Sequence, residues 1–204
     1  RGVEPLNLEK IHKMVEEATK GLAGVSASQV EIQSGIQFYD GISTVEIQEI
    51  LIRSASDLID LDHPNYQFVA ARLLLFALRK SLYGRQRELP HLETHINSCV
   101  GKQVYDGDIY TKYSKEEIDK ANSYIDHSRD FLFTYAGLRQ VADKYLVQDR
   151  STGGVYETPQ FMYMMIALTI FAQYPKQTRM NYVRRYYDAI SKHRINIPTP
   201  IMAG

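Results

Sequence analysis

Apolar residues recur at steps of three and four along most of the chain, which predicts a mainly helical protein. The first such segment, residues 7–21, has Asn7 at the position of a helix N-cap and Gly21 at the position of a helix stop. A short helix is expected from Ser26 or Ser28 to about Gly35. A longer one is expected from residue 43 or 44 to Leu61, the last member of its apolar stripe.

The segment 65–83 is apolar on nearly every side, which is typical of a central helix. Gly84 and the charged residues after it end this helix, and we place a domain boundary there. Apolar periodicity predicts further helices over residues 91–100, 115–124, 131–146 and 180–190.

The most apolar run, residues 161–172, has Thr169 as its only polar member and is expected to form a helix buried on all sides. It is too short to span a bilayer, which takes about 20 residues. The glycines near residue 153 predict a short β-hairpin. An alternating segment, residues 195–197, predicts a short strand, and Pro-Thr-Pro follows it.

Composition excludes several classes of protein. Lys plus Arg equals Asp plus Glu, at 24 each, so no net field favours nucleic acid or an anionic membrane. The single Cys99 rules out an internal disulfide and a zinc ribbon. No secretory signal is visible, so a cytoplasmic location is expected.

Helix starts with nearby lysines are the candidate phosphate-binding positions, because free N–H groups and an ammonium both attract a triphosphate. Asn7 with Lys10 fits this pattern, and Thr44 and Lys80 could add contacts in a compact bundle. The alternative is an ordinary cap for Asn7 and Thr44, and solvated surface charges for the lysines. Thr199, held between two prolines, presents a hydroxyl on a rigid backbone or is simply a turn residue.

The histidines show no metal-ligand spacing on one helical face, apart from His91 and His95. That pair lacks the intervening Glu of a zinc hydrolase, so the histidines are expected at the surface. Cys99 is interpreted as a structural or incidental residue.

Three stretches resemble the large subunit of class I ribonucleotide reductases. The run EPLNLEKI at residues 4–11 resembles the opening of an ATP-cone, a small helical nucleotide-sensing domain. The motifs AARL and LRK within residues 70–84 resemble the last helix of that cone. The run IPTPIMAG at residues 197–204 resembles the first barrel strand and substrate-phosphate loop, and YLV at residues 145–147 fits the helical region between.

The resemblance implies a mainly α fold: a four-helix ATP-cone over residues 1–84, then a helical domain with a short β-hairpin over residues 85–194. Residues 195–204 would begin a ten-stranded α/β barrel. ATP and dATP would be the allosteric effectors, and Thr199 would contact the substrate diphosphate. A Gln stands at position 48, where many members have His, so dATP inhibition stays open. The family pattern assigns effector contacts to Glu4, Asn7, Lys10, Thr44 and Lys80.

The family reduces ribonucleoside diphosphates to deoxyribonucleoside diphosphates through a thiyl radical, with catalytic cysteines that would lie beyond this sequence. The resemblance therefore implies no catalytic residue and no metal in this chain. The expected partners are the remainder of the large subunit (on the same or a separate chain), a second large subunit, and a small radical-generating subunit with a diiron centre. A stand-alone ATP-cone regulator and an all-α interaction module are the alternatives.

Overall fold

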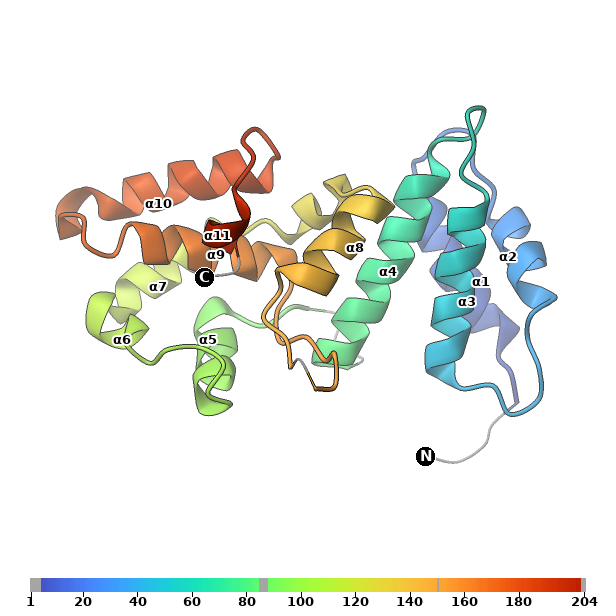
Figure 1. The fold of residues 1–204 in the computed structure, drawn as a ribbon, viewed down its shortest axis with the longest axis horizontal. Coiled ribbons are helices and arrows are strands. Elements are labelled where there is room, and N and C mark those ends of the chain that lie inside the picture. Colours follow the sequence, from blue (N-terminus) through green and yellow to red (C-terminus); the bar gives the residue numbers. More distant parts are fainter. Residues whose placement is uncertain (1–4, 85–87, 150, 203–204) are drawn as a thin grey trace. The chain divides into compact units, whose positions relative to one another are not determined.

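The computed structural model describes residues 5–84, 88–149 and 151–202, and it is helical almost throughout, as predicted (Figure 1). The chain divides into two compact units, which we describe separately. The first unit comprises Arg1–Arg79 with Phe131–Arg139, and the second comprises Lys80–Asp130 with Gln140–Gly204. No helix in the described ranges is long and apolar enough to cross a membrane.

The first unit contains the helices that the N-terminal pattern predicted. They are α1 (Leu8–Thr19), α2 (Ala27–Gly35), α3 (Thr44–Asp57) and most of α4 (Tyr66–Tyr83). The first three begin where a side chain caps free N–H groups: Asn7, Ser26 and Ser43 each accept a hydrogen bond from a backbone N–H three residues on. Gly21 has a φ of +73°, so the chain turns after α1 at a residue that tolerates this conformation.

Polar side chains of α4 fix the loop between α1 and α2 onto the bundle. Tyr66 is almost fully buried, and its hydroxyl accepts a hydrogen bond from Ser26 N at 2.9 Å. The Arg72 guanidinium donates to the carbonyl oxygens of Ala18 and Lys20, at 3.1 and 2.7 Å. These carbonyls belong to the last turn of α1, where backbone acceptors lack helical partners. The contacts bring segments about 50 residues apart together.

One residue of the predicted α3 stripe lies elsewhere. Leu61 is 99% exposed, because α3 ends at Asp57. Asp60 then accepts a hydrogen bond from His63 N at 2.6 Å, forming a local turn before α4. The apolar spacing in the sequence therefore extends beyond Asp57, where the helix ends.

Helices also form most of the remaining chain. They are α5 (Leu92–Gly101), α6 (Ile109–Lys112), α7 (Lys115–Asn122), the 3₁₀ helix η1 (His127–Leu132), α8 (Tyr135–Lys144), α9 (Pro159–Ile170), α10 (Lys176–Ser191) and α11 (Thr199–Met202). β pairing in the described ranges is limited to one antiparallel bridge, between Gln148 and Val155. Around it, Asp149 N donates to the Gly154 carbonyl and Tyr156 N to the Val147 carbonyl, so the chain reverses direction here.

Helices α9, α10 and α7 pack together in the second unit. A buried ion pair joins two of them: Arg179 of α10 donates to both carboxylate oxygens of Glu117 of α7, at 2.7 and 2.5 Å. Arg179 also donates to the Lys112 carbonyl oxygen, and its guanidinium lies 4.2 Å from the centre of the Tyr113 ring. This bidentate geometry satisfies the buried cation.

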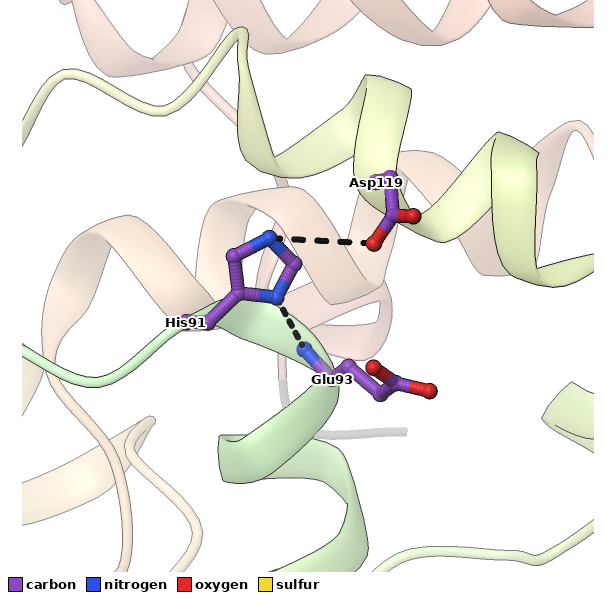
Figure 2. Close-up of side chains that lie close together, drawn as sticks. All are labelled: His91, Glu93 and Asp119. Carbon is purple, nitrogen blue, oxygen red and sulfur yellow. Dashed lines mark hydrogen bonds and ion pairs between the residues drawn. The ribbon is translucent and has the colours of Figure 1, made fainter.

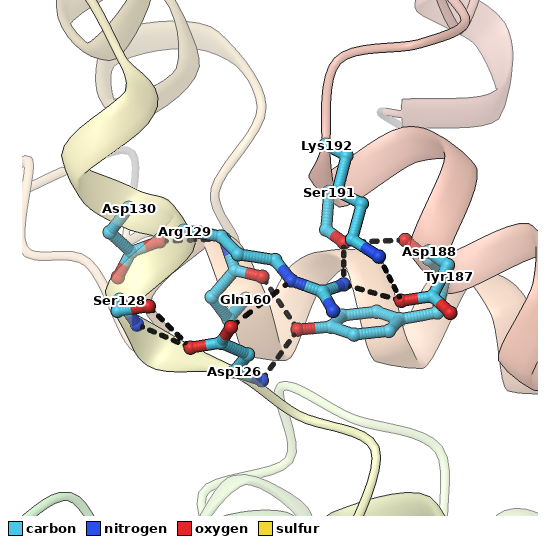
Figure 3. A network of polar contacts seen from close by, with 9 residues as sticks. All are labelled: Asp126, Ser128, Arg129, Asp130, Gln160, Tyr187, Asp188, Ser191 and Lys192. Atoms are coloured by element: carbon cyan, nitrogen blue, oxygen red, sulfur yellow. Dashed lines mark hydrogen bonds and ion pairs between the residues drawn. The ribbon is translucent and has the colours of Figure 1, made fainter.

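A second polar network connects η1, α9 and α10 (Figure 3). Gln160 donates to Asp130 at 2.9 Å and accepts from the Tyr187 hydroxyl at 2.7 Å, and all three side chains are buried. Arg129 donates to Ser191 Oγ at 2.6 Å and pairs with Asp188 at 2.8 Å. Because its buried polar groups are hydrogen-bonded to one another, the network helps to specify how these helices pack.

One expectation for the C-terminal half needs adjustment, and another stays a prediction. Helix α9 is largely buried as predicted, but its last residues, Thr169 and Ile170, are exposed, so it is not covered on all sides. Residues 195–197, expected as a strand, precede α11 and have no strand partner among the described residues.

Candidate functional site

The start of α1, where the sequence predicts phosphate contacts, is a capped helix N-terminus. Asn7 is the N-cap, and its Oδ1 accepts a hydrogen bond from Lys10 N at 2.9 Å. Both side chains are exposed, so the Lys10 ammonium is accessible to an anion in the first helical turn. Glu4, the third predicted contact in this segment, lies outside the described residues.

The predicted contact at Thr44 sits at the start of α3. The N-cap is Ser43 and Thr44 is the first helical residue, so the two alternatives for the helix start are resolved. Ser43 and Glu46 form a reciprocal capping box, with hydrogen bonds of 3.1 and 2.9 Å. The side chain of Thr44 is exposed and is not needed for the cap.

Lys80 lies in the last turn of α4 and is exposed. The division into units falls between Arg79 and Lys80, inside this helix. Within the described part of the first unit, no hydrogen bond joins the side chains of Asn7, Lys10 and Thr44. Asn7 and Lys10 lie at the start of α1 and Thr44 at the start of α3, so a common site would have to form around a ligand.

Thr199, the predicted substrate contact, is the first residue of the short α11 and is exposed. Its Oγ1 lies 3.1 Å from the hydroxyl oxygen of Tyr145, which follows α8. The two side chains are thus within hydrogen-bonding distance although they are 54 residues apart. The role of Tyr145 could not be found from the sequence, because nothing local relates the two positions.

A buried polar cluster around Cys99 also escaped the sequence analysis. His95 is only 3% exposed, so the expectation of a surface histidine was wrong at this position. Its ring stacks on Phe161 with centroids 4.1 Å apart, and its Nε2 lies 3.1 Å from the Tyr105 hydroxyl. A signal was available, because His95 shares the buried stripe of α5 with Leu92, Ile96 and Cys99.

The same cluster contains Glu157, which is fully buried and precedes α9. The Tyr105 hydroxyl donates to one carboxylate oxygen, and Val147 N donates to the other at 2.7 Å. Burial raises the pKa of Glu157 to about 7, against the lowering effect of these two donors. Burial also lowers the pKa of His95 to about 4 and raises the pKa of Cys99 to about 11. Uncharged forms are therefore favoured throughout the cluster.

His91, Glu93 and Asp119 bring three metal-ligating groups within 4.8 Å of one another (Figure 2). The contacts have another explanation. His91 is the N-cap of α5, and its Nδ1 accepts a hydrogen bond from Glu93 N at 3.3 Å, which leaves the ring proton on Nε2. That Nε2 points toward Asp119, 3.7 Å away. A metal at Nε2 would require the proton to move to Nδ1 and the cap to break.

Comparison with known families identifies the two parts of this architecture. Residues 2–81 match the ATP cone domain family, and residues 131–204 match the all-alpha domain of ribonucleotide reductase. The N-terminal helical bundle is therefore an ATP cone domain, and the C-terminal helices belong to a ribonucleotide reductase all-alpha domain.

Individual relatives give the same result over nearly the whole chain. The chain is 49% identical over 201 residues to ribonucleoside-diphosphate reductase 1 subunit alpha of Escherichia coli (strain K12), covering 98% of this chain and 26% of the relative. It is 48% identical to the alpha subunit of Haemophilus influenzae and 43% identical to that of Enterobacteria phage T4, again over 26% of each relative. The chain thus carries an ATP cone domain and a ribonucleotide reductase all-alpha domain, and it spans about a quarter of the length of the ribonucleoside-diphosphate reductase alpha subunits that it matches.

Proposed function

We propose that this chain is the allosteric and scaffold portion of a ribonucleoside-diphosphate reductase large subunit, and that it responds to ATP and dATP. The observation that carries the proposal is the ATP cone match over residues 2–81, in a chain 49% identical to a reductase alpha subunit over 98% of its length. The match of residues 131–204 to the reductase all-alpha domain favours this reading over a stand-alone cone regulator.

The proposed effector site combines helix ends and ammonium groups. The Asn7 cap and the Lys10 ammonium would bind the triphosphate at the start of α1. Thr44 would add a hydroxyl and an amide from the start of α3. Glu4 and Lys80 complete the set that the family pattern implies.

Calorimetric titration with ATP and dATP tests the effector site. Lys10→Ala removes a charged phosphate partner, so we expect the dissociation constant to rise about tenfold, which corresponds to about 1.4 kcal/mol. Lys13→Ala is the matched control, because Lys13 is an exposed lysine of the same helix that already pairs with Glu9 at 2.7 Å. Absence of nucleotide binding, or equal losses in the two variants, would contradict the assignment.

Thr199 is proposed to contact the diphosphate of the ribonucleotide substrate in the complete large subunit. The support is its exposed hydroxyl, its place between two prolines and the neighbouring Tyr145 hydroxyl. In the complete subunit, Thr199→Val should raise KM for the ribonucleoside diphosphate more than it lowers kcat. An unchanged KM would remove Thr199 from the substrate site. Residues 195–197 are proposed to form the first barrel strand there.

Radical chemistry is proposed to reside in the rest of the large subunit. Cys99 is the only cysteine of this chain, and its burial and high pKa make it a poor nucleophile. We infer that turnover requires the remaining large-subunit residues, a second large subunit and a small radical-generating subunit with a diiron centre. A cytoplasmic location is part of the same proposal. Deoxyribonucleotide production by the purified 204-residue chain alone would refute this division of roles.

A further inference from the structure

Two hydroxyl groups lie in contact at the start of the short helix α11. The hydroxyl oxygen of Tyr145 is 3.1 Å from Thr199 Oγ1, and the geometry permits either group to be the donor. Both residues belong to the second unit, so the contact lies within one compact part of the chain. Thr199 is exposed and Tyr145 is half-buried, so a ligand reaches the threonine more easily than the tyrosine.

Hydrogen bonds on both sides fix the backbone that carries Tyr145. Tyr145 N donates to the Val141 carbonyl oxygen at 3.0 Å, where α8 ends. Two residues further on, Val147 N donates to the buried Glu157 carboxylate at 2.7 Å. The Val147 carbonyl oxygen accepts from Tyr156 N at 2.9 Å. The tyrosine ring is therefore presented to Thr199 from a segment with little freedom to move.

Thr199 has a restrained backbone and a hydroxyl that can rotate. Pro198 and Pro200 on either side each hold φ at about −65°. The Pro198 carbonyl oxygen also accepts from Ile201 N at 3.0 Å. Rotation about the Cβ–Oγ1 bond remains, because a hydroxyl proton turns toward whichever acceptor is near. A partner that occupies one side of Oγ1 therefore decides where this proton points.

The chemistry of a diphosphate decides which of the two hydroxyls donates. Its ionised oxygens only accept hydrogen bonds, and a threonine hydroxyl has one proton and two lone pairs. If Thr199 contacts the diphosphate, its one proton goes to a phosphate oxygen. Thr199 Oγ1 can then only accept from Tyr145, whose own proton completes the chain. Accepting this bond also polarises the threonine O–H and strengthens it as a donor.

We propose that Tyr145 is a positioning residue for the substrate: its hydroxyl donates to Thr199 Oγ1, which directs the threonine proton to a diphosphate oxygen. This assignment rests on the proposed contact between Thr199 and the substrate. Tyr145 does not touch the substrate in this arrangement. It holds the Thr199 hydroxyl in the orientation that binds an acceptor.

Steady-state kinetics of the complete large subunit, assayed with its radical-generating partner, test the assignment. Tyr145→Phe keeps the ring and removes one neutral hydrogen bond, so KM for the ribonucleoside diphosphate should rise about fivefold with kcat nearly unchanged. Thr199→Val should raise KM about tenfold or more, because the lost bond is to a charged oxygen. Tyr110→Phe is the matched control. It loses a tyrosine hydrogen bond to Asn97, 2.5 Å long, and should leave KM unchanged.

A double-mutant cycle shows whether Tyr145 acts through the threonine. In the Thr199→Val background, Tyr145→Phe should cause no further rise in KM, because the hydrogen bond is already absent. In the Thr199→Ser background, which keeps the hydroxyl, the rise should again be about fivefold. Equal effects of Tyr145→Phe in the valine and wild-type backgrounds would overturn the positioning role, since the two residues would then act independently.

The direction of the hydrogen bond is tested by Tyr145→3-fluorotyrosine. Fluorine beside the hydroxyl withdraws electrons, which makes the O–H a stronger donor and its oxygen a weaker acceptor. At a pH where the fluorinated phenol keeps its proton, this variant should lower KM below the wild-type value. A KM at or above the wild-type value would mean that the tyrosine does not donate, and the assignment would fail.

The outcomes separate the positioning role from the substrate contact on which it rests. A higher KM for Thr199→Val with an unchanged KM for Tyr145→Phe would remove the role of Tyr145 and leave the Thr199 contact standing. An unchanged KM for Thr199→Val would remove both. Circular dichroism of each variant checks that a change in KM does not come from unfolding.

Discussion

The free energy of unfolding should depend on pH partly through the buried carboxyl group of Glu157. Replacing Glu157 with Gln should remove most of that contribution. Burial raises its pKa from the ordinary value of 4.5 to about 7 in the folded chain. At about 1.4 kcal/mol for each pKa unit, this difference corresponds to about 3 kcal/mol of folding free energy.

The sign follows from which form the folded state prefers. The folded chain binds the proton more tightly than the unfolded chain, so the stabilisation from protonated Glu157 is complete below pH 4.5. It is lost as the pH rises to about 7 and is absent above that value. Most of the loss, about 2.5 kcal/mol, falls between pH 5 and pH 8.

The Gln variant imitates the protonated carboxyl group. Its amide oxygen can accept from Val147 N, and its amide nitrogen can donate to the Tyr105 oxygen, which then donates to His95 Nε2, 3.1 Å away. The cluster therefore keeps its hydrogen bonds without a group that titrates. The pKa of Glu157 reflects its burial, opposed by the Tyr105 and Val147 donors, and His95, with a pKa near 4, stays uncharged between pH 5 and pH 8.

Urea denaturation followed by circular dichroism at pH 5 and pH 8 measures the effect. The wild-type chain should lose about 2.5 kcal/mol more than Glu157→Gln between these pH values, because every other titrating group is common to both proteins. Glu88→Gln, at an exposed glutamate, is the control and should behave like the wild type. Equal losses in wild type and Glu157→Gln would refute the reasoning.

Three further outcomes are expected. Arg179→Met should lower the free energy of unfolding by about 3 kcal/mol in thermal or urea denaturation, because it leaves Glu117 without its bidentate partner. A smaller loss in the Arg179→Met, Glu117→Gln double variant would confirm that the unpaired charge is responsible, and an equal or larger loss would contradict it. Ser43→Ala should cost about 1 kcal/mol by removing the cap of α3, while Ser43→Asp should retain most of the stability. On the proposal that Thr199 contacts the substrate, Tyr145→Phe should weaken substrate binding by the complete subunit less than Thr199→Val does, because the Tyr145 hydroxyl contacts the threonine hydroxyl. A larger effect of Tyr145→Phe would indicate direct contact with the substrate.

Local chemistry made the N-terminal helices predictable. Asn7 and Ser43 indicate helix starts, because each side chain accepts a hydrogen bond from the free backbone N–H three residues further on. Gly21 indicates the end of a helix, because the chain turns there through a positive φ that glycine adopts readily. The error at Leu61 shows the limit of apolar spacing, since the turn at Asp60 ended the helical region first.

Features that depend on distant residues were not predictable from one sequence. The Tyr105–Glu157 hydrogen bond and the Tyr145–Thr199 contact each join residues more than 50 positions apart. The local patterns of a single sequence do not indicate which distant segments will lie in contact. The stripe position of His95 could have indicated burial, but a histidine side chain is polar enough that the surface was the default expectation.

The two polar atoms of the Asn7 side chain can serve different purposes at the start of α1. Asn7 uses its carbonyl oxygen to accept from Lys10 N, which leaves its amide nitrogen as the group available to a phosphate. An aspartate at this position would keep the acceptor and the helix start, yet it would replace the outward donor with a second negative oxygen. At the proposed effector site, exchanging one NH₂ for one oxygen would therefore weaken nucleotide binding, while the helix start would keep its cap.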